Sequence, residues 1–195
     1  MAGRKAAMDQ RAREIFEVAC RILCEMGYER ASIRDLAEAA GMTKAGLYYY
    51  FKSKEELLFL ILDSYMDDLL SGMEEITTQV EDPEERLKAY IRFQVERYCS
   101  DTYRSKLIIN DENCLSGEWF QIVKDKQRRY LSYWRETLDR FGRDRGRPIS
   151  HLSAHVMLLV GMCNWIYQWY HPEGDLPPLE LADLIFRRFV HGLDG

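Results

Sequence analysis

The amino-acid sequence predicts an all-α protein, in which an N-terminal domain of three helices precedes a larger helical domain. Apolar residues recur at the helical spacing along nearly all of its 195 residues. No segment alternates between apolar and polar residues in the way that a half-buried strand does. With 47% hydrophobic and 30% charged residues, the composition is that of a globular protein with a buried core.

The first helix is predicted to end at Gly27. Ser32 and Asp35 have the spacing of a capping box, which predicts that a second helix begins there. Gly41 is placed to end that second helix. The apolar face of the first helix comprises Ile15, Ala19, Ile22, Leu23 and Met26.

Thr43 is the predicted N-cap of a short third helix, from Lys44 to Phe51. Ser53 and Glu56 form a second capping box, which opens a long helix to about Val80. The remaining helices are expected to begin at Pro83, after the N-cap Asp82, and to span about 102–112, 117–141, 150–170 and 178–193.

The second and third helices are joined by a turn, Gly41 and Met42, that is too short to let them pack antiparallel. Leu47 and Phe51 lie four residues apart and give the third helix a buried face. This is the arrangement of a helix-turn-helix, whose second helix enters the major groove of DNA. The buried face of the preceding helix comprises Ile33, Leu36, Ala37 and Ala40.

The outward face of the third helix carries groups that suit DNA. Lys44 can donate to O6 or N7 of guanine, and Ala45 is small enough to approach the methyl group of thymine. The tyrosine hydroxyls suit phosphate, a contact that fixes register without reading sequence. Gly46 costs about 1 kcal/mol in mid-helix relative to alanine, which either a close approach to DNA or a packing contact would explain.

The charge is distributed unevenly along the chain, although the net charge is −5. Residues 1–54 carry ten Lys or Arg against seven Asp or Glu, which gives +3. The remainder carries seventeen against twenty-five, which gives −8. A basic head on an acidic body is expected when only the head contacts phosphate.

Residues 32–54 resemble the helix-turn-helix signature of the TetR (tetracycline-repressor-like) family. Tyr50 stands where many members have histidine, and both side chains can bond a phosphate. The matching residues are Ser32, Leu36, Ala37, Ala40, Gly41, Met42, Thr43, Leu47, Tyr48, Tyr50, Phe51 and Lys54.

The resemblance implies a DNA-binding domain over residues 1–53 and a ligand-binding and dimerisation domain over residues 54–195. It implies a regulator, most often a repressor, that binds palindromic double-stranded operator DNA as a homodimer and is released by a small-molecule effector. The base-reading role falls on Arg34, Lys44, Ala45, Gly46 and Tyr48, and the phosphate-binding role falls on Thr43, Tyr49, Tyr50 and Lys54.

The last two predicted helices carry apolar stripes that pack either the chain's own core or the same helices of a partner. A two-fold interface between such helices is the usual arrangement in the family and matches palindromic operators. The residues expected in this dimer interface are Leu152, Val156, Leu159, Leu181, Leu184, Ile185 and Phe189.

Aromatic residues in the second domain are candidates for the wall of a ligand pocket, and core packing is the alternative. The C-terminal part resembles the acyl-CoA-responsive subgroup of the family, with Arg128, Arg129 and Arg135 available for a CoA phosphate. A multidrug- or aromatic-compound-responsive repressor is a second reading, and a helical interaction protein that does not bind DNA is a distant third. The candidate pocket residues are Trp119, Phe120, Tyr130, Trp134, Trp165 and Trp169.

Other function classes lack their motifs. There is no nucleophile elbow or glycine-rich phosphate loop, so we expect no enzyme and no cofactor. His151 and His155 lie one turn apart without an evident third ligand, so we expect no metal. The five cysteines form no CxxC pair and read as reduced thiols. Without a signal peptide or a membrane-length apolar run, the protein is expected in the cytoplasm, away from membranes.

Overall fold

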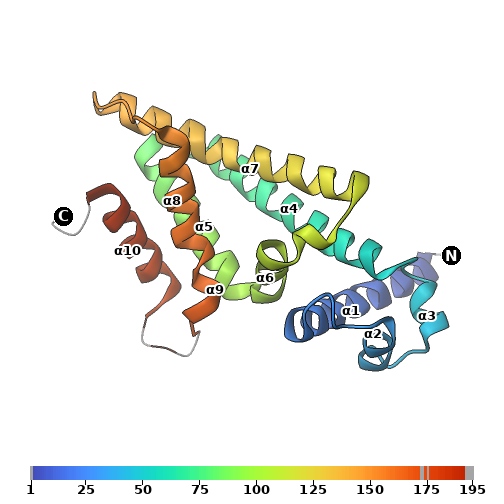
Figure 1. Ribbon diagram of the computed structural model, residues 1–195. Coiled ribbons are helices and arrows are strands. Elements are labelled where there is room, and N and C mark those ends of the chain that lie inside the picture. Colours follow the sequence, from blue (N-terminus) through green and yellow to red (C-terminus); the bar gives the residue numbers. More distant parts are fainter. Residues whose placement is uncertain (1, 172–173, 175, 192–195) are drawn as a thin grey trace. The chain divides into compact units, whose positions relative to one another are not determined.

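The computed structural model describes residues 2–171, 174 and 176–191, and the regular structure of these residues is entirely helical (Figure 1). The first four helices are α1 (Ala2–Met26), α2 (Ile33–Ala39), α3 (Lys44–Tyr48) and α4 (Lys54–Gln79). They are followed by α5 (Pro83–Ser100), α6 (Thr102–Asn110), a short 3₁₀ turn (Glu112–Cys114), α7 (Gly117–Asp144), α8 (Leu152–Asn164), α9 (Ile166–Trp169) and α10 (Pro178–His191). The all-α prediction is confirmed for the part of the chain that is described.

The chain forms two compact units, which we describe separately. The head unit comprises the residues up to Tyr65 together with Lys106–Val123, and the body unit comprises Met66–Ser105 and the residues from Lys124 onward. This division differs from the boundary predicted after Ser53. The first three turns of α4 belong to the head because their apolar residues complete its core, namely Leu57, Leu58, Ile61 and Leu62, each fully buried.

Two helix ends differ from the prediction. Helix α3 stops at Tyr48 rather than Phe51, because the backbone N–H groups of Tyr50 and Phe51 both turn back to the carbonyl of Leu47. The helix predicted over 150–170 is divided at Trp165, whose ψ of −12° closes a tight turn between α8 and α9.

The second predicted capping box is only half formed. The Ser53 hydroxyl accepts a hydrogen bond from the backbone N–H of Glu56 at 3.0 Å, as an N-cap does. The Glu56 carboxylate, however, accepts from the backbone N–H of Lys52 rather than from that of Ser53. Helix α4 therefore begins where it was predicted. The hydrogen bond to the Glu56 carboxylate comes from the residue before the N-cap instead of from the N-cap itself.

Within the body unit, α5 lies alongside both α8 and α10 (Figure 1). Gly72 lets α5 approach α4 closely, since a Cβ atom there would stand 2.1 Å from the ring of Phe93. The interior between α5 and α7 is aromatic, and the Tyr90 ring contacts that of Trp134 edge-to-face at 5.4 Å. Both side chains are completely buried.

Candidate DNA-binding and effector sites

A capping box and a tight turn hold the helix-turn-helix. The hydroxyl of Ser32 accepts from the N–H of Asp35 at 3.2 Å, and the Asp35 carboxylate accepts from the N–H of Ser32 at 2.8 Å, which confirms the predicted box. These side-chain and backbone hydrogen bonds with Ser32 lower the pKa of Asp35. At the turn, Gly41 has a φ of 63°, a left-handed conformation that glycine adopts readily. The Met42 N–H closes the turn by donating to the carbonyl of Ala37 at 2.8 Å.

The inward faces of the two helices form the centre of the head's core. Of the residues predicted to point inward, Leu36, Ala37, Leu47 and Phe51 are buried, whereas Ile33 and Ala40 are half-buried. Arg11 of α1 holds the C-terminal end of α2, because its guanidinium donates to the carbonyl of Ala40 at 2.8 Å. Helix α3 is thus positioned by buried contacts, which leaves its other face open.

That other face is exposed. Lys44 and Ala45 of α3 are open to solvent, and Tyr48 is half exposed. Tyr49, directly after α3, is 73% exposed, and Arg34 of α2 is also exposed. These five of the nine predicted DNA-binding residues therefore have side chains that a DNA duplex could reach.

Thr43 and Tyr50 are partly engaged within the head. The Thr43 hydroxyl accepts from the N–H of Gly46 at 3.1 Å, as a helix cap, and keeps its own proton to donate. Tyr50 is half-buried, and its ring lies edge-on to that of Tyr49 with 5.3 Å between the centroids. For Thr43, the predicted phosphate contact would add to a structural role.

Packing within the head does not require a glycine at position 46. A Cβ atom at this position would meet its nearest neighbours, atoms of Met42 and Thr43, at 3.4 Å, which is an ordinary van der Waals contact. A packing contact, which was one of the two explanations offered for this mid-helix glycine, is therefore not supported by the structure.

Lys54, which was predicted to contact phosphate, makes contacts within the head. Its ammonium group donates to the carbonyl of Tyr28 at 2.8 Å and to that of Ala31 at 3.0 Å. It also lies 4.1 Å from the centre of the Tyr28 ring, a cation–π distance. The lysine therefore binds the loop between α1 and α2 to the start of α4, where sequence reasoning placed a phosphate contact. Lys54 and Tyr28 lie 26 residues apart, so no local sequence pattern predicts this bond.

The six aromatic residues proposed for a ligand pocket fall into three environments. Tyr130 and Trp134 are buried inside the body unit. Trp119 and Phe120 belong to the head unit, where Trp119 stacks on Phe59 at 5.4 Å. Trp165 and Trp169 are exposed, at 63% and 46%. The structure therefore supports an interior position for the first pair alone.

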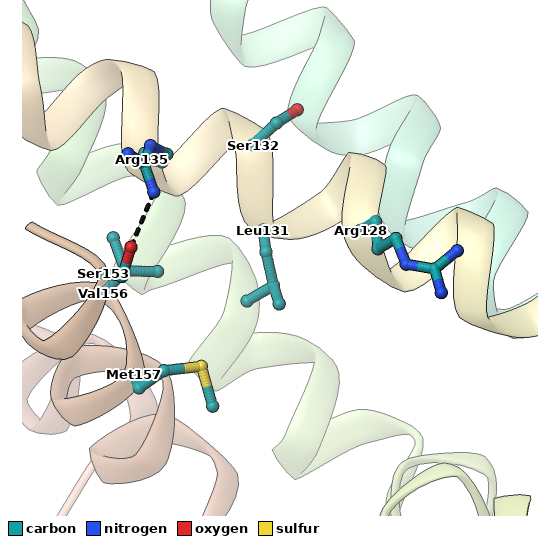
Figure 2. Close-up of a pocket in the computed structure, with 7 residues that line it drawn as sticks. All are labelled: Arg128, Leu131, Ser132, Arg135, Ser153, Val156 and Met157. Carbon is teal, nitrogen blue, oxygen red and sulfur yellow. Dashed lines mark hydrogen bonds between the residues drawn. The ribbon is translucent and has the colours of Figure 1, made fainter.

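A recess of about 270 Å³ lies in the body unit, between α7 and α8 (Figure 2). Arg128 and Arg135 border it, and the Arg135 guanidinium donates to the Ser153 hydroxyl at 2.6 Å. Arg128 forms an ion pair with Asp125. The third predicted arginine, Arg129, does not line the recess. The remaining lining residues are Leu131, Ser132, Val156 and Met157.

The predicted dimer-interface residues lie mostly in the protomer's own core, which was the alternative reading of their stripes. Leu152, Leu184 and Phe189 are half-buried, whereas Val156, Leu159, Leu181 and Ile185 are at most 6% exposed.

A different face of α8 is apolar and exposed. Met157, Leu158 and Met162 of α8, and Trp165 directly after it, are between 38% and 63% exposed, and a Cβ atom added at Gly161 would meet no neighbouring atom within 4 Å. Sequence reasoning missed this stripe because α8 is apolar on nearly all sides, so that periodicity could not tell its inner face from its outer one.

Other classes of site find little support in the described part of the chain. None of the five cysteines forms a disulfide, and burial raises the pKa of the Cys163 thiol to about 12, which leaves it protonated. Among the described residues, no three potential metal ligands of the His, Cys, Asp or Glu type lie together. Nor does any described helix have the length and apolar character needed to cross a membrane.

Comparison with known proteins gives two family matches and several relatives. Residues 15–61 match the bacterial regulatory proteins of the TetR family, and residues 80–193 match the tetracyclin repressor-like C-terminal domain. The repressor KstR2 of Mycobacterium tuberculosis H37Rv is 25% identical over 175 residues, which cover 87% of this chain and 86% of KstR2.

Two solved structures are similar over almost the whole chain. A TetR-family regulator from Bordetella parapertussis is 28% identical with a TM-score of 0.89, covering 93% of this chain and 95% of its own. AibR, crystallised with isovaleryl coenzyme A and operator DNA, is 30% identical with a TM-score of 0.82, covering 91% and 96%. Since the C-terminal family match alone spans more than half of the sequence, the chain belongs to the TetR family of transcriptional regulators.

Proposed function

We propose that this regulator is a repressor that binds palindromic operator DNA as a homodimer and is released by an acyl-CoA effector. The observation that carries the proposal is the exposed face of α3, held on a helix-turn-helix whose other side is buried. The operator-bound AibR complex supports it, because AibR is similar to this chain along nearly its whole length.

Base reading is assigned to the exposed face of α3. Lys44 at the first turn can donate to guanine, and Ala45 leaves room for a thymine methyl group. Tyr48 and Tyr49 carry hydroxyl groups at exposed positions, where they can reach bases or phosphates. Arg34 of α2 is exposed as well and adds positive charge to the same domain.

The dimer surface is assigned to the exposed stripe of α8 described above. Such an apolar patch is unusual on a monomer and is typical of an interface. Gly161 supports this assignment, because a mid-helix glycine with open space around it lets a second helix approach closely. A two-fold dimer would place two heads in successive major grooves, about 34–36 Å apart.

The effector is assigned to the body unit. The recess between α7 and α8 combines two arginines with an apolar lining, as a ligand with an anionic and an apolar part requires. An acyl-CoA has both parts. Helix α4 is continuous from the head unit into the body unit, which offers a route for coupling. Because coupling is reciprocal, an effector that prefers the DNA-free form must weaken DNA binding.

A mobility-shift assay with the protein's own upstream DNA tests the proposal. We expect a shifted band at physiological salt, and its loss when isovaleryl-CoA or a pool of longer acyl-CoAs is added. A band released by hydrophobic cations and not by acyl-CoAs would favour the drug-responsive alternative.

Variants of the head provide the control. Lys44→Ala and Tyr48→Ala should each weaken operator binding by about 1–3 kcal/mol if they read bases. Arg187→Ala removes one positive charge from an exposed position of α10 and should leave binding unchanged. If neither Lys44→Ala nor Tyr48→Ala bound genomic fragments any more weakly than the wild type, α3 would not read DNA, and the interaction protein whose helix-turn-helix has lost that role would be favoured.

A further inference from the structure

The interior of the body unit holds a cluster of polar side chains between α5 and α7. Tyr130 donates its hydroxyl to Gln94 Oε1 at 2.7 Å, and the Tyr130 ring lies 6.2 Å from that of Trp134. The Tyr90 ring also contacts that of Trp134, with 5.4 Å between the centroids. Gln94, Tyr90 and Trp134 have no exposed surface, and Tyr130 has 7%.

The hydroxyl groups of Thr77 and Tyr90, at the edge of this cluster, both have hydrogen-bond partners. Thr77 donates to the carbonyl of Met73 at 2.6 Å, which uses its only proton. The 2.5 Å contact between Thr77 and Tyr90 therefore has the Tyr90 hydroxyl as its donor.

Two N–H donors in the cluster remain unmatched. Neither Gln94 Nε2 nor Trp134 Nε1 has an acceptor within hydrogen-bonding distance among the described residues. Buried polar groups are almost always hydrogen-bonded, so an unmatched pair within one cluster is unusual. An indole nitrogen can only donate, which means that the missing partner of Trp134 is an acceptor.

The surroundings restrict the chemistry of that acceptor. Gln94, Tyr90, Tyr130, Trp134 and Thr77 are all neutral, so a buried carboxylate or phosphate would find no countercharge among them. A carbonyl oxygen is neutral and has two lone pairs, enough for two donors.

We propose that Trp134 Nε1 and Gln94 Nε2 bind a carbonyl oxygen of the effector inside the body unit. The inference rests on the proposed function, since it requires an effector in this unit, and it adds the group by which that effector is recognised. For an acyl-CoA the group is the thioester carbonyl. Trp134 and Gln94 then select thioesters over equally apolar molecules that lack the oxygen.

The test compares isovaleryl-CoA with its thioether analogue S-(3-methylbutyl)-CoA, in which CH₂ replaces the carbonyl. Calorimetry on the full chain should give at least tenfold tighter binding of the thioester. In Trp134→Phe this ratio should fall to about threefold or less. Any cavity left by the smaller ring affects both ligands alike, so the ratio isolates the hydrogen bond. Trp169→Phe, at a half-exposed indole, is the matched control and should keep the wild-type ratio.

A ratio near one in the wild type, or an unchanged ratio in Trp134→Phe, would overturn the inference while leaving release of DNA by isovaleryl-CoA intact. Failure of both CoA compounds to bind would instead remove the acyl-CoA part of the proposed function.

A measurement on the free protein decides the inference in that case too. Replacing Trp134 with 3-benzothienylalanine keeps the ring's shape and removes its N–H. An unmatched donor predicts an unchanged or higher melting temperature for the free protein. A lower melting temperature would mean that the N–H already has a partner without effector, such as an internal water, and would overturn the inference.

Discussion

The ammonium group of Lys54 lies 2.8 Å from the backbone oxygen of Tyr28 and over the ring of the same residue. This one side chain thereby joins the start of α4 to the loop that precedes the reading helices. Burial, followed by the nearby Glu55 carboxylate, raises the pKa of the Tyr28 hydroxyl to about 12, so that Tyr28 stays neutral beneath the lysine. The family signature ends at this lysine, and its hydrogen bonds and ring contact place it among the residues that hold the head together.

Lys54→Met should therefore lower the free energy of unfolding. Hydrogen bonds to charged groups contribute about 1.5–3 kcal/mol each, and we expect a loss of about 2 kcal/mol because the site is only partly buried. Denaturant unfolding measures it, with Lys52→Met at an exposed neighbouring position as the control. If Lys54→Met left stability unchanged and reduced the salt dependence of DNA binding by about one charge, the lysine would be a phosphate contact after all.

Gly46→Ala should separate stability from DNA binding. The added methyl group fits at van der Waals distance and raises helix propensity, so the variant should be more stable by up to about 1 kcal/mol. Its operator affinity should fall if the helix backbone approaches DNA closely at this residue. Thermal unfolding and a binding titration measure the two effects, and an unchanged affinity would show that the approach is not close.

Leu158→Glu should convert the proposed dimer into monomers. A carboxylate at the centre of the α8 stripe would be buried against its own copy, without a countercharge. Sedimentation velocity should show at least a tenfold weaker association, and operator binding should fall with it. Tyr103→Glu places the same charge at an exposed aromatic residue of α6 and should leave the oligomeric state unaltered. Dimers that persist in Leu158→Glu would move the interface elsewhere.

Asp111→Asn should stabilise the head unit at neutral pH. Burial raises the pKa of Asp111, although its hydrogen bond from the Tyr28 backbone and the nearby Lys106 oppose this. Because the pKa is higher in the folded than in the unfolded protein, ionisation above it reduces stability. Asparagine keeps an acceptor for Tyr28 and never ionises.

The advantage of Asp111→Asn should therefore be largest at neutral pH. It should shrink as the pH falls through the raised pKa and vanish below the ordinary value of about 4. Unfolding curves across this range measure it, and an advantage that grew toward acid would contradict the assignment.

Local sequence signals predicted the head well. The capping box of Ser32 and Asp35, the Gly41 turn and the inward positions of Leu36 and Leu47 are each set by residues within a few positions of one another. Such short-range features follow from backbone hydrogen bonding and helical periodicity alone.

The body was harder to predict because its features depend on distant residues. The contact between Trp134 and Tyr90 joins α7 to α5, and even in the head the bond from Lys54 to Tyr28 joins the start of α4 to a loop 26 residues earlier in the chain. On α8, apolar residues occur on both faces, so Val156 was assigned to a surface and Leu158 was overlooked. Only tertiary packing distinguishes such faces.

The bonds that assemble the head come from Ser32, Asp35, Arg11 and Lys54, whereas Lys44, Ala45 and Tyr48 on the reading face contribute little to them. If Lys44, Ala45 and Tyr48 read operator bases as proposed, foldability and sequence preference are encoded at separate positions. New side chains at 44, 45 and 48 could be exchanged, by evolution or by a designer, to redirect the protein to other promoters with little penalty in folding.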